Sequence, residues 1–160
     1  MFASLFAAAL IAAAPADDAA VATALFEICP KILDGRIAFD NPRDLTAIGY
    51  VPSTPRGKAV WAKGGPAGEP VFVASVTTDK ARSCAVTFVD DAPHSRFERM
   101  AALAATHGYQ GPAPSAAGDP AKPRIAILSK NGDSLTMITV ANHIELGDMP
   151  STVALFRRGN

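Results

Sequence analysis

RSCAVTFV, residues 82–89, is the stretch that decides the fold we expect for this chain. Its β-branched and aromatic residues are typical of a strand, and the alternation along a strand places Cys84, Val86 and Phe88 on one face. The run PVFVASVTT (70–78) precedes it, and the intervening residues DKA separate the two runs as in a hairpin. The two stretches therefore predict an antiparallel pair of strands.

Four further runs with strand composition lie on both sides of this pair. KAVWAK (58–63) comes before it, and RIAILSK (124–130), SLTMITVANHIE (134–145) and STVALFRR (151–158) come after it. The turn sequence NGD between the first two of the later runs is a strong signal for a hairpin. The chain therefore predicts an antiparallel sheet of about six strands.

Apolar residues recur at helical spacing in the segments between these runs. The first helix follows Asp17 and is interrupted by Pro30, which lacks an N–H group and so kinks or restarts the helix. A short helix is predicted over 42–48, after the capping residue Asn41, and a longer one over 95–107. The predicted order is helix, short helix, three strands, helix and three strands, an α+β fold with the helices packed on one face of the sheet.

A Gly-Tyr pair follows a helix twice in this order, at Gly49-Tyr50 and at Gly108-Tyr109. Each pair precedes a loop that contains proline and then three predicted strands. One interpretation is an internal duplication of an α-βββ unit. The other is that glycine commonly ends helices and that a following tyrosine packs back on the core. Both interpretations stay open at the level of the sequence.

The N-terminal segment MFASLFAAALIAAAPA, residues 1–16, has the organisation of a secretory signal. It is uncharged and apolar, and Ala14-Pro15-Ala16 fits a signal-peptidase site, although no lysine or arginine precedes the apolar run. The alternative is a short membrane anchor, but the run falls below the roughly 20 residues of a span. We therefore expect a cleaved leader, a single α+β domain over 17–160, no membrane span after cleavage, and a periplasmic or secreted protein.

Charge and composition narrow the range of partners. The 15 acidic and 15 basic residues balance, with no long run of either sign. This balance argues against a nucleic-acid surface or a polybasic membrane patch. The expected partner is an envelope protein or a small ligand.

Cys29 and Cys84 are the two cysteines of the chain. In an exported protein such a pair predicts a disulfide, here between the first helix and a central strand. The alternatives are two unpaired buried thiols, a metal site or a catalytic thiol. A metal site wants closely spaced ligands, and no CxxC motif is present, so we expect no metal.

The chain carries no GxSxG, HExxH, GxGxxG or phosphate-loop motif, so we expect no cofactor. The only local acid–base group is Asp90-Asp91 with His94. Read as chemistry, it suggests a small hydrolase-like enzyme that uses His94 with Asp90 or Asp91. Read as structure, the acids mark the start of the 95–107 helix and the histidine is solvated.

Trp61, Tyr50 and Arg56 form the predicted binding site, since aromatic and arginine side chains are the usual hot-spot types of interfaces. Trp61 as an anchor of the core is the alternative. The function that we expect is that of an exported accessory protein, a non-catalytic binding or inhibitor-like module for a protein or small ligand. The hydrolase, and a structural or stress-related envelope protein, are the other candidates.

Overall fold

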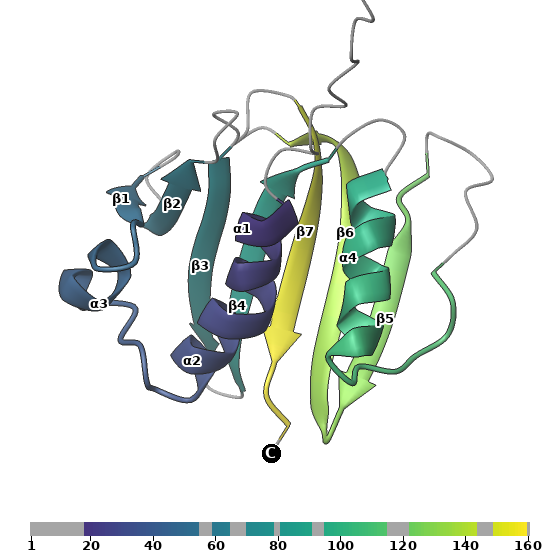
Figure 1. Cartoon of the computed structure of the whole chain (residues 1–160), viewed down its shortest axis with the longest axis horizontal. Helices are drawn as coiled ribbons and strands as arrows, with labels where there is room; N and C mark the ends of the chain where they lie inside the picture. Colours follow the sequence, from purple (N-terminus) through teal and green to yellow (C-terminus); the bar gives the residue numbers. More distant parts are fainter. Residues whose placement is uncertain are drawn as a thin grey trace, which may run out of the picture.

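The computed structural model describes residues 18–54, 59–64, 70–78, 81–90, 95–114, 122–143 and 149–159. These residues form one antiparallel sheet of seven strands (Figure 1), so the predicted α+β class with an antiparallel sheet is confirmed. The strands are β1 Val51–Ser53, β2 Val60–Gly64, β3 Pro70–Thr78, β4 Ala81–Val89, β5 Ile125–Lys130, β6 Asp133–His143 and β7 Met149–Arg157. The prediction of about six strands missed β1, a short edge strand in which Pro52 is tolerated. The predicted leader lies outside the described residues.

The first helical segment is continuous from α1 (Asp18–Thr23) through the π-helical turn η1 (Ala24–Ile28) to α2 (Cys29–Leu33). In the π-helical turn the N–H of Cys29 donates to the carbonyl of Ala24, five residues back. Pro30 lies in the first turn of α2, and the wider preceding turn lets the helix continue through a residue without an N–H group.

The other helices are α3 (Pro42–Thr46) and α4 (Ser95–Thr106). In Figure 1 the α1–α2 segment and α4 lie side by side in front of the sheet, while α3 lies at its edge near β1. α2 packs on β4 and β7, and α4 packs on β6.

The strands β4 and β7 form the middle of the sheet, whose order is β1-β2-β3-β4-β7-β6-β5. Ala85 pairs with Leu155 across this middle, between the pairs Cys84–Phe156 and Val86–Ala154. Going outward from the middle, β4, β3 and β2 follow on one side and β7, β6 and β5 on the other. Both sides therefore have three consecutive antiparallel strands, with the last strand of each set innermost.

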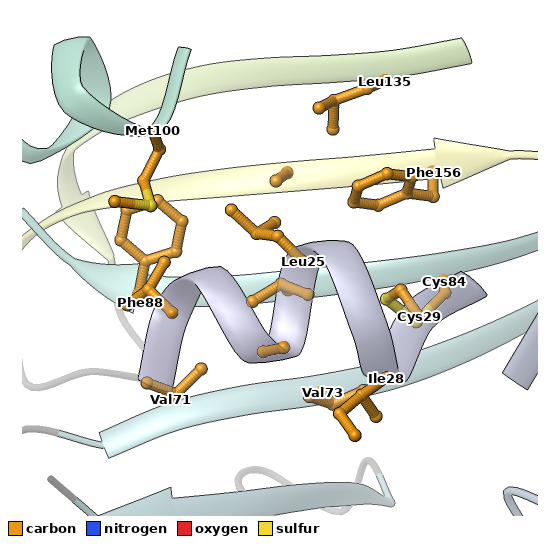
Figure 2. Close-up of a cluster of buried hydrophobic side chains, with 14 of the residues drawn as sticks. Leu25, Ile28, Cys29, Val71, Val73, Cys84, Phe88, Met100, Leu135 and Phe156 are labelled. Atoms are coloured by element: carbon orange, nitrogen blue, oxygen red, sulfur yellow. A yellow bond between two sulfur atoms is a disulfide. The ribbon is translucent and has the colours of Figure 1, made fainter. Parts of the chain in front are cut away.

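The core lies between the helices and the sheet face that carries Cys84, Val86 and Phe88, as the alternation in β4 predicted. Figure 2 shows Leu25 and Ile28 of the helical segment facing side chains of the strands. Fully buried side chains on neighbouring strands include Val73, Phe88, Leu135, Met137 and Phe156.

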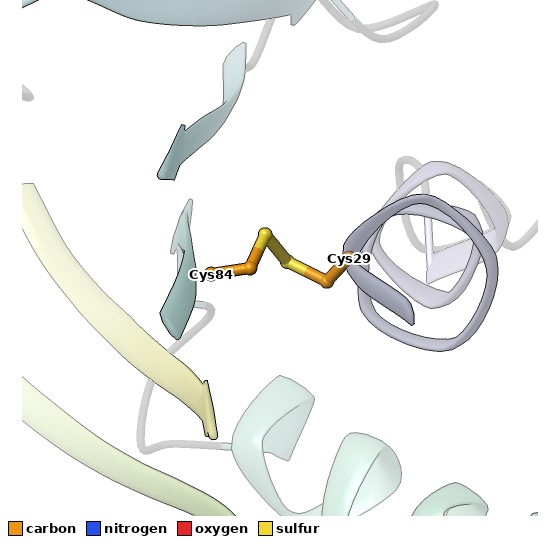
Figure 3. Close-up of a disulfide and its surroundings, with 2 residues drawn as sticks. All are labelled: Cys29 and Cys84. Carbon is orange, nitrogen blue, oxygen red and sulfur yellow. A yellow bond between two sulfur atoms is a disulfide. The ribbon is translucent and has the colours of Figure 1, made fainter. Parts of the chain in front are cut away.

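The predicted disulfide joins Cys29 to Cys84, with the two Cα atoms 5.5 Å apart and both residues fully buried (Figure 3). It links the start of α2 to the middle of β4 across 55 residues of chain. Closing a loop of this length removes conformational entropy from the unfolded chain that corresponds to roughly 4 kcal/mol.

A second link joins the two long helical segments. The carboxylate of Asp18 in α1 accepts from Arg96 Nε at 3.1 Å and from Arg99 Nε at 2.5 Å, both in α4. The side chain of Arg96 is only 5% exposed. A buried guanidinium is costly without an ionic partner, so this contact secures the packing of α1 against α4.

Candidate functional site

Two chain turns have nearly the same backbone geometry. Gly49 and Gly108 have φ of +89° and +85°, a conformation that only glycine adopts easily. The N–H of the following tyrosine, Tyr50 or Tyr109, donates at 3.0 Å to a carbonyl five residues back in each case. Both are helix ends in which a left-handed glycine turns the chain toward the sheet.

A lysine completes each turn in the same way. Lys63 Nζ donates at 3.0 Å to the carbonyl two residues before Tyr50, and lies 5.6 Å from the centre of that ring. Lys130 Nζ donates at 2.6 Å to the carbonyl two residues before Tyr109, and lies 5.7 Å from the centre of that ring. Each ammonium group therefore interacts with a helix C-terminus and an aromatic face, both of which attract cations.

The two turns differ in the side chains around the lysine. At the first turn, Ile48 precedes the glycine and Val71 pairs with the lysine across the strands. At the second turn, His107 and Asp133 take these places. The ring of His107 stacks on Phe26, with 4.2 Å between centroids and 9° between planes. Of the two turns, only the second therefore has polar, titratable side chains beside its lysine.

The second turn forms one wall of a cavity of about 490 Å³, which we call the Tyr109 cleft. Phe26, His107 and Tyr109 provide its aromatic side chains. Its volume lies within the range of about 300–1,000 Å³ that small-molecule sites occupy. The charged residues of the Tyr109 cleft are Asp34, Arg36, Lys130, Asp133 and Arg158.

Most of these charges are paired with one another. Asp34 forms ion pairs with Arg36 and Arg158, and Arg158 Nε also lies 3.5 Å from Asp133. Lys130 has no carboxylate partner among the residues that the structure describes. Its ammonium group donates a hydrogen bond to the carbonyl of His107 instead. The Tyr109 cleft thus has three cations against two carboxylates, and Lys130 carries the positive charge that no carboxylate balances.

The hydroxyl of Tyr109 has no hydrogen-bond partner among the described residues, although the side chain is only 7% exposed. Burial, and to a smaller extent the Asp133 carboxylate, raise the pKa of Tyr109 above its ordinary value. The hydroxyl of Tyr50 has no such partner either, and burial raises its pKa to about 12. Of the two, Tyr109 is the tyrosine that lines the Tyr109 cleft.

A second cavity, of about 570 Å³, lies beside the C-terminal end of α2. Its lining includes the apolar residues Ile32, Leu33 and Phe39 and the polar residues Asp40, Ser75 and Arg82. It is larger but carries fewer charges, and neither tyrosine contributes to it.

The sheet face that points away from the core forms a third feature, which we call the open face. Two rows of cross-strand neighbours run along it and contain no charged side chain. Exposed fractions reach 58% at Ile127, 39% at Ile125 and 36% at Ile138. One row is Val51, Ala62, Phe72, Thr87, Val153, Ile138 and Ile125, and the other is Ala74, Ala85, Leu155, Thr136 and Ile127.

The residues of the predicted binding site lie apart from the Tyr109 cleft. Tyr50 and Trp61 are 1% and 6% exposed, and Trp61 Nε1 donates at 3.0 Å to the carbonyl of Phe39. Arg56 lies outside the described residues. Both rings pack in the core in this structure, and their role in recognition stays a prediction.

Asp90, from the predicted acid–base group, is a buried helix cap. Its Oδ1 accepts from the N–H groups of Arg96 and Phe97 at 3.1 and 3.3 Å, and its Oδ2 accepts from Thr152 Oγ1 at 3.0 Å. These contacts fit the interpretation of the acid as a helix start. Asp91 and His94 lie outside the described residues, so the hydrolase-like arrangement stays a prediction.

Comparisons with protein families, with curated proteins and with solved structures found no match for this chain. Within the described ranges, no helix has both the length and the apolar character needed to cross a membrane. The same ranges hold no group of three or more His, Cys, Asp or Glu side chains placed to bind a metal.

The Tyr109 cleft was not predicted from the sequence. His107 was an isolated histidine near a helix end, and Asp34, Asp133 and Arg158 are far apart in the chain. The usable signal was the repeated Gly-Tyr pair. A comparison of the residues around the two pairs would have singled out His107 in place of Ile48.

Proposed function

We propose that this chain is an exported, non-catalytic binding module that takes a small anionic ligand in the Tyr109 cleft. The observation that carries the proposal is the cavity at the second Gly-Tyr turn, which His107 and Asp133 line together with Tyr109 and Lys130. Within the described residues the Tyr109 hydroxyl has no hydrogen-bond partner there and the Lys130 ammonium group has no carboxylate partner. Buried polar groups are hydrogen-bonded in the great majority of proteins, so a donor left without a partner in a cavity is a candidate for ligand contact.

The first Gly-Tyr turn supports this choice, because it serves as an internal reference. Tyr50 and Lys63 have the same backbone and the same lysine–ring contact as their counterparts. The stability that this geometry contributes is therefore available without polar neighbours. His107 and Asp133 are additions that the structural role of the turn does not require, and both line the Tyr109 cleft.

The chemistry of the Tyr109 cleft favours a ligand with an anionic group and an aromatic or apolar part. Lys130 and the Tyr109 hydroxyl are donors for a carboxylate or phosphate. Arg36 and Arg158 can exchange part of their contact with Asp34 for the same anion. Phe26, which stacks on His107, offers an aromatic surface for the remainder of the ligand.

Export is the second part of the proposal. The uncharged leader over 1–16 supports secretion with cleavage before Asp17, and hence one domain over 17–160 in the periplasm or outside the cell. The disulfide Cys29–Cys84 supports an oxidising compartment.

Duplication of an α-βββ unit is the third part. A half-turn about the pair Ala85–Leu155 exchanges the pairs Cys84–Phe156 and Val86–Ala154. The same operation relates β2, β3 and β4 to β5, β6 and β7. In chain order, α3 before the first Gly-Tyr turn corresponds to α4 before the second. The shared geometry of the two Gly-Tyr turns supports it further. On this proposal, the second unit gained the polar residues of the Tyr109 cleft after the units diverged.

The test is a titration of the purified protein with inorganic phosphate, phenyl phosphate and phenylacetate, followed through the backbone amide signals by NMR. We expect saturable shifts at Tyr109 and Lys130, largest for the aromatic anions. Tyr109→Phe keeps the ring and removes the donor, so it should weaken binding by about tenfold, the effect of one hydrogen bond to a charged group. Shifts that are absent, or that center on the 570 Å³ cavity instead, would refute this assignment.

A further inference from the structure

The open face is apolar in a way that a solvated sheet face is not. Antiparallel sheets with one face in water normally alternate apolar and polar residues along each strand. Here ten of the twelve residues in the two rows are apolar, and the other two are Thr87 and Thr136. The middle of the open face therefore has the composition of a sheet that is covered on both faces.

From this we infer that the open face packs against the open face of a second copy of the chain, as a two-layer sheet dimer. The inference does not rest on the proposed ligand, because the Tyr109 cleft lies beside the helices and shares no residue with the rows that form the open face.

The area of the open face suits a small, weakly associating dimer. β3, β4 and β7 have nine residues each, or about 30 Å, and seven strands spaced by about 4.8 Å measure about 29 Å across. The outward residues Ser83, Val89 and Ser151 near the strand ends are buried, so the open area is that of the two rows. Their twelve residues cover roughly 400 Å², about half of the roughly 800 Å² that each partner buries in a standard interface. Exposed apolar patches on monomers rarely exceed a few hundred Å².

The charge pattern favours a second copy over a charged partner. In a twofold dimer the same patch lies on both subunits, so any charge in its centre meets an identical charge. The two rows of the open face carry none, and Arg157 lies at the rim, paired with Ser83 and Ser134. Two such sheets can pack about 10 Å apart with their strands crossed by about 30°.

The experiment is sedimentation equilibrium on the protein purified after expression of the full chain. Ile138→Lys places a charge in one of the two rows, and Ile48→Lys is its matched control. Ile138 and Ile48 are 36% and 38% exposed, but Ile48 lies in the turn after α3, off the open face. Circular dichroism checks that both variants fold.

We expect the unmodified protein and Ile48→Lys to sediment as dimers, and Ile138→Lys to dissociate at least about tenfold more readily. A monomer at about 100 μM, near the weak end of specific association, would overturn the inference. The same holds for equal dissociation of the two variants, and for a monomer whose open face is covered by another protein or by its own N-terminal segment.

Discussion

The ammonium group of Lys130 lies 5.7 Å from the centre of the Tyr109 ring, and Lys63 stands in nearly the same relation to Tyr50, at 5.6 Å. One Gly-Tyr turn therefore serves as a control for the other. Geometry that both turns share is architectural, and what is present at one turn alone is a candidate for function.

The first prediction concerns the disulfide. Reduction of the Cys29–Cys84 bond, or its replacement in a Cys29→Ser/Cys84→Ser variant, should lower the free energy of unfolding by roughly 4 kcal/mol. Urea denaturation with and without reductant measures the difference. Thiol titration of the denatured, unreduced protein should find no free cysteine. A free thiol, or a loss below about 1 kcal/mol, would contradict the assigned role of the bridge.

The second prediction concerns the ion pairs that link α1 to α4. Asp18→Asn should lower the free energy of unfolding by about 1–3 kcal/mol, because the ion pair between the buried Arg96 and the Asp18 carboxylate is lost. Glu27→Gln is the control, since the Glu27–Lys31 pair is exposed and should contribute less than about 0.5 kcal/mol. Similar losses in both variants, measured by urea denaturation, would show that the buried pair has no special weight.

The third prediction concerns the helix cap Asp90. Asp90→Ala should lower the free energy of unfolding by about 2 kcal/mol or more, because two backbone N–H groups and the Thr152 hydroxyl lose their acceptor in a buried site. Asp40→Ala, at an exposed position, should change stability by less than about 0.5 kcal/mol. If Asp90→Ala leaves stability intact, capping does not explain this residue, and the hydrolase-like arrangement with His94 gains weight.

The fourth prediction concerns alkaline pH. Burial raises the pKa of Tyr50 to about 12 and raises that of Tyr109 in the same direction. Between pH 10 and 12 the unfolded chain loses the Tyr50 proton that the folded chain retains, and Tyr109 adds to this difference in the same direction. The stability contributed by Tyr50 is therefore fully present below pH 10 and falls as the pH rises toward 12, by up to about 1.4 kcal/mol per pH unit.

Absorbance at 295 nm checks this directly, because the chain has two tyrosines and one tryptophan. At pH 10 about half of the tyrosine should be ionised in the denatured protein, and less than half in the folded protein. Tyr50→Phe should reduce the slope of stability against pH. Ionisation of both tyrosines near pH 10 in the folded protein would contradict their burial.

Much of the fold was readable from local patterns. The β-branched runs predicted β3 and β4, the Asn-Gly turn predicted the β5–β6 hairpin, and the two cysteines predicted the disulfide. β1 escaped because it is short and contains Pro52, and its pairing with β2 depends on long-range contacts. The Tyr109 cleft escaped for the same reason, since Asp34, Asp133 and Arg158 meet only after the sheet and helices have assembled.

The most direct test of the central claim, that the Tyr109 cleft is the ligand site, is phenyl phosphate binding to Lys130→Met and Lys63→Met. Both variants lose the same lysine–tyrosine contact and the same hydrogen bond to a helix end, so both should lose about 1 kcal/mol of stability. We expect Lys130→Met to bind at least about tenfold more weakly than the unmodified protein, and Lys63→Met to bind as it does. Equal affinity of the two variants would contradict the assignment.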